Sequence, residues 1–251
     1  MGRIHTTPCR TDADSTDGSV SAPASVASTA VRRGGGARRR PPGPKLFRHD
    51  RSLGVRYVAG ADEAGRGCLA GPLVAAAVLF DHERLRPADI RVLSALNDSK
   101  RRSAALRAEL YPVILRLATK VAVVSRCAPG IDERGLHVTN LHALHDALAA
   151  VAVDGCICLS DGFAVPELPF PQRAVIRGDA TSAAIAAASV IAKETRDRYM
   201  RRVDARMPGW EFGQHVGYAT SEHRQAIKRL GVTPLHRMSF QSAAYQQLTL
   251  D

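Results

Sequence analysis

Five short apolar runs, separated by polar and glycine-rich segments, predict five β-strands. The runs cover residues 55–61, 72–80, 120–128, 155–162 and 172–180. They are rich in valine, alanine and isoleucine and are bounded by turn-forming residues, which is typical of buried strands. Because only a short, glycine-containing segment separates the first two runs, we expect them to pair antiparallel.

Apolar residues at three- and four-residue spacing predict four helices between and after these strands. The helical ranges are 103–118, 132–151, 182–202 and 221–231. A Thr181-Ser182 pair precedes the third, alanine-rich range, and the fourth begins at Ser221 and ends at Gly231. Serine and threonine before a helix and glycine after it are the usual start and stop signals.

The order of these elements predicts an α/β fold. Strands come first and then alternate with helices, which favours a mixed sheet flanked by helices, with a C-terminal helical region. Residues 1–45 contain small polar residues followed by arginine, glycine and proline, so we expect a disordered basic tail. Its arginines either attract phosphate or form a solvated tail. The folded domain is expected over residues 46–251.

The net charge of the chain narrows the classes of molecule that it is expected to bind. The 251 residues carry a net charge of +11, and the part after the tail is itself basic. Such a chain favours a polyanion, a nucleic acid or an anionic membrane, although basic surfaces also aid solubility. No run of about 18 apolar residues occurs, so no membrane span is expected. Five cysteines without a CxxC spacing favour a reducing, cytoplasmic setting.

Three of the predicted strands end in carboxylates: Asp62 with Glu63, Asp161 and Asp179. Ligand sites in open α/β sheets lie beyond strand ends. Neighbouring strand residues point to opposite faces, so the first strand must end at Asp62 if both its acids serve one site. Each acid alone fits a cap or turn. Gathered together, the four acids would repel one another unless their oxygens bound divalent cations. Such cations on a basic protein predict phosphodiester hydrolysis.

Seven stretches, in order, resemble the bacterial ribonuclease HII family, the type 2 ribonucleases H, over roughly residues 55–244. They are GADEAGRGCLAGPLVAAAV, LNDSK, LSDG, IRGDA, AAASVIAKETRD, HVGYATSEH and TPLHRMSF. The resemblance implies a ribonuclease H-like sheet and an endonuclease that hydrolyses the RNA strand of RNA–DNA hybrids. It also implies cutting 5′ of a single ribonucleotide in duplex DNA, leaving 3′-hydroxyl and 5′-phosphate ends, in DNA replication and repair.

The resemblance also implies the site. Its four metal-binding and catalytic carboxylates fall on Asp62, Glu63, Asp161 and Asp179, with Mg²⁺ or Mn²⁺ as cofactor and two metals when substrate is bound. Asp197 is the alternative to Asp179 as fourth ligand. We expect a cytoplasmic monomer that binds hybrids and ribonucleotide-containing duplex DNA, and no membrane.

Substrate contacts follow from the same resemblance. The backbone of Gly65, Arg66 and Gly67 would read the 2′-hydroxyl, which needs the close approach that glycine permits. Arg66, Lys100 and Lys193 would contact phosphates, although Lys193 is also spaced to form a surface pair with Asp197. Tyr218 would pack on the next deoxynucleotide sugar, or else is a half-buried core tyrosine.

Two further features are open. His215 lies in a family motif and would approach substrate or metal. The chain ends in QQLTLD, and the segment from Gln247 to Asp251 resembles peptides that dock on a sliding clamp, although the usual terminal aromatic residue is missing. A frayed terminus is the alternative.

Two other functions compete. A proofreading exonuclease or junction resolvase would also gather acids on a similar sheet, but an adjacent DE followed by GRG is not their pattern. A non-catalytic nucleic-acid binder would bind in a salt-sensitive way without divalent cations, and it leaves the carboxylates unexplained.

Overall fold

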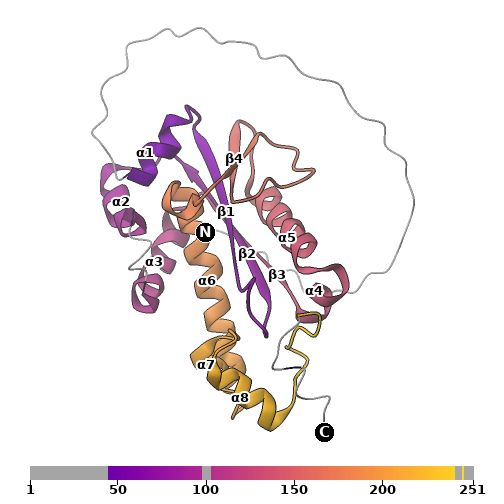
Figure 1. The fold of residues 1–251 in the computed structure, drawn as a ribbon. Coiled ribbons are helices and arrows are strands. Elements are labelled where there is room, and N and C mark those ends of the chain that lie inside the picture. Colours follow the sequence, from indigo (N-terminus) through magenta and orange to yellow (C-terminus); the bar gives the residue numbers. More distant parts are fainter. Residues whose placement is uncertain (1–44, 98–102, 241–244, 246–251) are drawn as a thin grey trace, which may run out of the picture.

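The computed structural model describes residues 45–97, 103–240 and Tyr245. Figure 1 shows a twisted sheet with helices on both faces and a C-terminal helical region at one end. The predicted tail up to residue 44, Lys100 and the segment from Gln247 to Asp251 lie outside the described residues.

The five predicted strands form one mixed sheet with the order β3-β2-β1-β4-β5. The central strand β1 pairs antiparallel with β2, as expected, and parallel with β4; β2 pairs antiparallel with β3, and β4 parallel with β5. The bounds are β1 (Tyr57–Ala64), β2 (Leu73–Asp81), β3 (Lys120–Arg126), β4 (Cys156–Asp161) and β5 (Gln172–Val175). The predicted α/β class with a mixed, helix-flanked sheet is confirmed.

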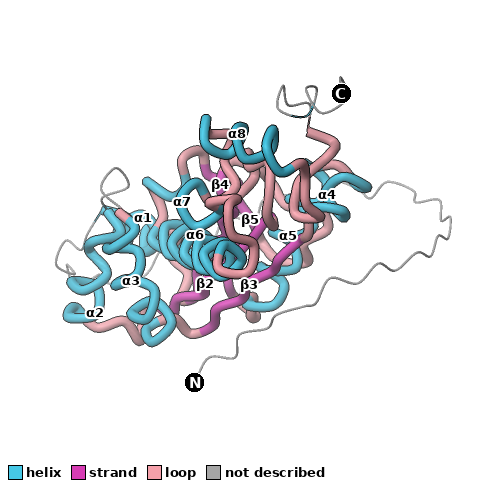
Figure 2. The backbone as a smooth tube through the Cα atoms, turned by 90° about the horizontal axis from the view of Figure 1, so that it is seen from below, coloured by secondary structure: helices cyan, strands magenta, loops and turns pink. Residues whose placement is uncertain are grey.

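Helices cover both faces of this sheet. The helices are α1 (Lys45–Ser52), α2 (Pro87–Val92), α3 (Ala104–Leu117), α4 (Ala128–Arg134), α5 (Leu136–Val151), α6 (Ala183–Asp204), α7 (Phe212–His215) and α8 (Ser221–Leu230), with 3₁₀ turns η1 (Leu93–Asn97) and η2 (Gly178–Ala180). Figure 2 shows α1, α2 and α3 together on one flank and α4 and α5 on the other. None of the helices in the described ranges is long and apolar enough to cross a bilayer.

Side-chain alternation along β1 separates two of the hydrophobic clusters of the core. Val58 and Ala64 pack with the alanine-rich helix α6, and Ala59 and Ala61 pack with α5 on the opposite face. A Cβ atom at Gly60 would lie 2.2 Å from the backbone nitrogen of Ile185, so α6 rests directly on β1. Small side chains therefore hold the helix close to the strand that carries the candidate acids.

The start of α6 is fixed by two side chains. Ser182 accepts a hydrogen bond from the amide of Ile185 at 3.3 Å, as its capping role predicts. Asp50 of α1, which is fully buried, accepts another from the amide of Ala184 at 3.0 Å. The second contact joins residues far apart in the sequence and anchors α1 to α6.

Two predicted strand ends are wrong. Strand β1 does not end at Asp62 but runs through both acids to Ala64, because β2 continues to pair with it beside Ala75 and Ala76. Strand β5 ends at Val175, so Asp179 lies in the 3₁₀ turn η2 rather than at a strand end. Gly135, with φ +81°, divides the helix predicted over residues 132–151 into α4 and α5.

Candidate active site

Two of the four acids lie on neighbouring parallel strands, Asp161 at the end of β4 and Asp62 two residues before the end of β1. The register of β1 and β4 pairs Ala61 with Ser160, so Asp62 and Asp161 are each the next residue along. The carboxyl ends of parallel strands meet at one edge of a sheet, which places both acids there. This edge is the candidate active site.

The neighbouring acids Asp62 and Glu63 face opposite sides of the sheet. Asp62 lies against Ser189 of α6, and Glu63 lies against Asn140 of α5. Asp62 also accepts a hydrogen bond from the amide of Glu63 at 2.7 Å. Because the strand continues past both residues, one carboxylate belongs to each face of the same edge.

Asp161 and Asp179 are connected through the turn after β5. The amide of Gly178 donates a hydrogen bond of 2.7 Å to the Asp161 carboxylate. A Cβ atom at Gly178 would lie 3.2 Å from that carboxylate and 2.5 Å from the side chain of Ile185. Glycine therefore brings the turn carrying Asp179 against the end of β4.

Electrostatics shows that the acids interact. Burial, together with the charges of Glu63 and Asp161, raises the pKa of Asp62 to about 7. Burial raises the pKa of Glu63, Arg66 opposes this shift, and the charge of Asp161 adds to it. Burial also raises the pKa of Asp161, the Gly178 amide opposes the rise, and Asp179 adds to it. A cation would relieve this repulsion.

The donor chemistry fits a hard divalent cation. Oxygen Oε2 of Glu63 is buried and has no hydrogen-bond partner. Carboxylate oxygens are the preferred ligands of Mg²⁺ and Mn²⁺. Within the described ranges, however, no three His, Cys, Asp or Glu side chains are already gathered as a metal-binding group. The acids must therefore turn towards one another to share an ion.

The two glycines of the Gly65-Arg66-Gly67 loop meet different surroundings. A Cβ atom at Gly65, which has φ +88°, would lie 2.0 Å from Nε of Arg196, whereas one at Gly67 would meet nothing within 4 Å. Arg66 lies 3.6 Å from Glu63 and its guanidinium covers the ring of Phe163 at 4.8 Å. Packing inside the protein thus explains Gly65, and open space for a ligand remains at Gly67.

Lys193 and Tyr218 are brought together beside this loop. The Lys193 ammonium lies 5.3 Å from the centre of the Tyr218 ring, which is 40% exposed. Lys193 also pairs with Asp197 at 2.6 Å, and Arg107 of α3 pairs with the same carboxylate at 3.0 Å. Two cationic side chains therefore pair with the Asp197 carboxylate, which disfavours Asp197 as the fourth metal ligand.

Three histidines form a buried cluster behind Tyr218. The rings of His215 and His223 stack 4.2 Å apart, and Nε2 of His223 lies 3.2 Å from Nε2 of His236. The Gly217 amide donates to Nδ1 of His215, and Nδ1 of His223 lies 2.8 Å from the Tyr218 carbonyl oxygen. His215 thus supports the Tyr218 segment from inside, where we had expected contact with substrate or metal.

Sequence reasoning missed several side chains at this edge. They are Arg107, Asn140, Phe163, Ser189, Arg196 and Arg237. Arg196 carried a usable signal, because it shares the helix face of Ala192 and Met200 at four-residue spacing, and that face is buried. The others depend on tertiary contacts between separate elements.

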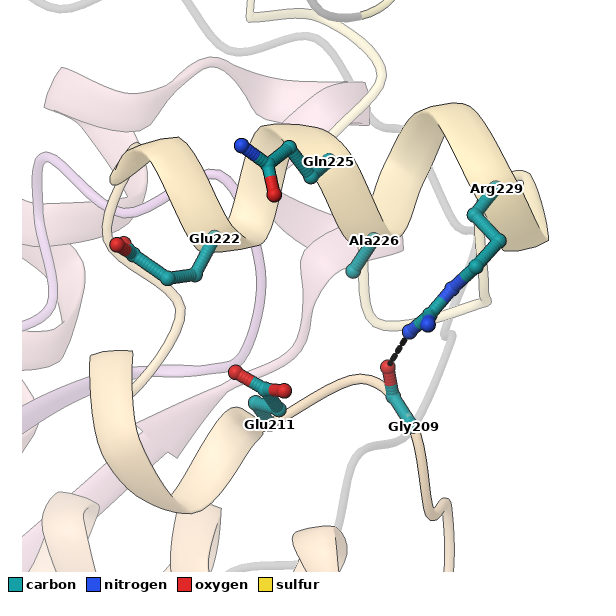
Figure 3. A pocket seen from close by; sticks show the side chains of 6 residues that line it. All are labelled: Gly209, Glu211, Glu222, Gln225, Ala226 and Arg229. Atoms are coloured by element: carbon teal, nitrogen blue, oxygen red, sulfur yellow. Dashed lines mark hydrogen bonds between the residues drawn. The ribbon is translucent and has the colours of Figure 1, made fainter.

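A pocket elsewhere has none of this chemistry. It measures about 240 Å³ and lies between α8 and the turn before α7 (Figure 3). Its lining residues are Gly209, Glu211, Glu222, Gln225, Ala226 and Arg229. None of the four candidate acids or the loop glycines contributes to it, so we do not assign the reaction to this pocket.

Known proteins share this fold. A ribonuclease H2 from Pyrococcus horikoshii OT3 superposes with a TM-score of 0.64 at 23% identity, covering 78% of this chain and 100% of the other. Bst-RNase HIII in complex with Mn²⁺ gives 0.61 at 19% identity, covering 80% and 71%. The ribonuclease HII in a complex with PCNA from Archaeoglobus fulgidus gives 0.62 at 26%, covering 74% and 95%.

Sequence comparison identifies the family. The family model described as Ribonuclease HII matches residues 59–243. A ribonuclease HII of Mycobacterium tuberculosis (strain ATCC 25618 / H37Rv) is 49% identical over 187 residues, 74% of this chain and 69% of that protein. One from Mycobacteroides abscessus is 47% identical over 189 residues, 75% and 78%. The chain belongs to the bacterial ribonuclease HII family.

Proposed function

We propose that this ribonuclease H endonuclease uses divalent cations to cut 5′ of a ribonucleotide in duplex DNA and within RNA–DNA hybrids, leaving 3′-hydroxyl and 5′-phosphate ends. Family membership gives the nuclease activity. The observation that carries the proposal is the placing of Asp62 and Asp161 at one edge, on neighbouring parallel strands. Removal of ribonucleotides during replication and repair in the cytoplasm is the cellular role that this activity would serve.

Asp62, Glu63, Asp161 and Asp179 would hold Mg²⁺ or Mn²⁺. A pair of such ions held there would supply the chemistry that activates the attacking water and offsets charge on the departing 3′-oxygen. The buried Oε2 of Glu63 supports this assignment, because it has no hydrogen-bond partner and a buried polar atom without one is costly. Burial raises the pKa of Asp62 to about 7, and a bound cation would oppose this rise by favouring the charged form.

The chain's own residues would orient the substrate. The backbone at Gly67 is open to a ligand, so its polar groups would approach the 2′-hydroxyl of the ribonucleotide. Arg66 and Lys193, whose side chains are partly exposed, would contact phosphates of the substrate, and Lys100 adds a third expected contact outside the described residues. Tyr218 would pack on the next sugar and exclude a second 2′-hydroxyl.

The decisive assay uses duplex DNA carrying one ribonucleotide, with Mg²⁺, Mn²⁺ or a chelator. Asp62→Asn and Asp161→Asn should each lose most cleavage and keep hybrid binding, because the basic contacts remain. Asp154→Asn, an exposed acid in the turn before β4, is the matched control and should cleave normally. Near-normal turnover of both site variants, or turnover in chelator, would contradict the proposal.

A sliding clamp is a further proposed partner. The archaeal ribonuclease HII noted above was solved in a complex with PCNA, and the segment from Gln247 to Asp251 of this chain resembles clamp-docking peptides. A pull-down with purified clamp should weaken when residues 247–251 are removed. Unchanged capture by the shortened chain would dismiss this contact.

A further inference from the structure

Arg196 of α6 is a fully buried cation that binds backbone instead of a carboxylate. Its Nε donates to the carbonyl of Pro72 at 2.8 Å, Nη1 to that of Val216 at 2.8 Å, and Nη2 to that of Ala70 at 3.0 Å. No acid in the described ranges lies within ion-pair distance of it. One side chain therefore bonds the segment after the Gly65–Gly67 loop and the segment before Tyr218.

Three glycines make room for this guanidinium. Added Cβ atoms at Gly65, Gly71 and Gly217 would lie 2.0, 3.1 and 3.3 Å from Arg196 nitrogen atoms, and all three residues have positive φ. Two amides, of Leu69 and Ala70, also donate to the Gly217 carbonyl at 2.8 and 3.3 Å. The packing around Arg196 thus includes residues of both segments.

Among the described residues, the other fully buried arginine binds only one of these two segments. Arg237 donates to the carbonyl of Gly71 at 2.9 and 3.1 Å and to that of Arg66 at 3.0 Å. None of these bonds reaches Val216 or Gly217. Arg237 therefore shapes the loop, whereas Arg196 sets the loop's position relative to the Tyr218 segment.

We propose that Arg196 is a positioning residue that fixes the spacing between the Gly65–Gly67 backbone and the Tyr218 ring, and thereby sets the preference for a lone ribonucleotide over a uniform hybrid. The inference rests on the proposed function. In a lone-ribonucleotide duplex, the loop reads a ribose while Tyr218 meets a bare deoxyribose. In a uniform hybrid the second sugar has a 2′-hydroxyl, so correct spacing gives no advantage there.

The test compares kcat/KM on the two substrates for Arg196→Lys. Lysine keeps the charge, but its single nitrogen cannot donate to three separated carbonyls. We expect the ratio of lone-ribonucleotide to hybrid cleavage to fall about tenfold or more, since small displacements in a site have large effects on rate. Arg198→Lys, on the same helix and ion-paired with Glu194, is the control and should keep the ratio. An unchanged ratio in folded Arg196→Lys overturns the proposal.

A second variant covers the case in which Arg196→Lys does not fold. Val216 has φ +42°, which is strained for a β-branched residue and allowed for glycine. Val216→Gly keeps the carbonyl that accepts from Arg196 but frees the backbone that carries it, so this bond no longer holds the Tyr218 segment at one spacing. It should lower the same ratio, and a ratio equal to that of the wild type would also overturn the proposal.

Hydrogen exchange separates this inference from the proposed function. In Arg196→Lys the amides of Leu69 and Ala70 should exchange faster, whether or not the protein is a nuclease. If the wild type cuts neither substrate, the proposed function fails while exchange still tests the link between the segments. Unchanged exchange at both amides shows that Arg196 does not position them and overturns the inference.

Discussion

Asp62 and Glu63 are consecutive in β1, yet their side chains lie on opposite faces of the sheet, one against Ser189 and the other against Asn140. Asp161 is the acid whose charge reaches both. A cation shared among them must therefore sit at the edge of the sheet, where carboxylates from the two faces can meet around the end of β4.

Removing the charge of Asp62 should stabilise the metal-free protein. Its pKa in the folded state, about 7, lies above the usual 3.8, so folding favours the protonated form and stability falls as pH rises from about 4 to 7. At pH 8, Asp62→Asn should raise the free energy of unfolding by roughly 1–3 kcal/mol, and at pH 4 by little. Urea unfolding in chelator measures this.

Asp154→Asn is the control and should leave the free energy of unfolding unchanged at pH 8 and at pH 4, because that acid is exposed. If Asp62→Asn were less stable than the wild type at pH 8, the repulsion inferred at the edge would not exist. If the prediction holds, Asp62→Asn is more stable than the wild type and yet inactive, as expected where a binding site keeps unfavourable charge for its ligand.

Alanine at the two loop glycines should give opposite kinds of defect. Gly65→Ala places Cβ 2.0 Å from Arg196 at a positive φ, so it should destabilise the fold by about 2 kcal/mol or more. Gly67→Ala meets open space and should leave the melting temperature unchanged while reducing cleavage at a lone ribonucleotide. Thermal unfolding and the cleavage assay, run on both variants, distinguish the two.

A Gly67→Ala protein with full activity would show that substrate does not approach this backbone. An equal loss of stability in both variants would show instead that both glycines are required by the fold. Either result would change the assignment of the loop without affecting the carboxylates.

The histidine cluster should make the protein sensitive to acid. Burial lowers the pKa of His223 and of His236 to about 4, against 6.5 for an ordinary histidine. Neutral rings therefore favour the fold above pH 6.5, and that contribution is lost as pH falls towards 4, by up to roughly 3 kcal/mol per ring. Unfolding free energies measured from pH 7.5 to 4.5 should fall accordingly.

His236→Asn should lower stability at pH 7.5 and flatten this dependence, because one of the titrating rings is gone. His142→Gln, at an exposed position of α5, is the control and should keep the slope of the wild type. If His236→Asn retained the full slope, another group would be responsible for the acid sensitivity.

The fold could largely be predicted from local pattern. Short apolar runs bounded by turn-forming residues located all five strands, because β1, β2 and β4 are buried along both faces. The extension of β1 through Asp62 and Glu63 could not be predicted. It depends on pairing with Ala75 and Ala76 of β2, and polar residues in the strand hide that pairing.

The candidate site was only partly predictable for the same reason. The acids and the loop were visible as motifs, whereas Asn140 and Arg237 reach the site from elements distant in the sequence. Gly65 was assigned to substrate approach, but its closest constraint is Arg196, 131 positions further along the chain by the numbering. A sequence motif can show that a position requires glycine, but it does not show which neighbouring atom occupies the space that a side chain would fill.

The alanine face of α6 also limits how this enzyme can change. Ser189, Lys193, Arg196 and Asp197 all belong to the one helix that rests on β1 at Gly60. A bulkier residue anywhere along that contact would lift the helix as a rigid rod and displace all four side chains at once. Random mutagenesis should therefore recover well-folded but inactive proteins that carry substitutions at the buried alanines of α6. Changes that restore activity should appear in β1 and not around the acids.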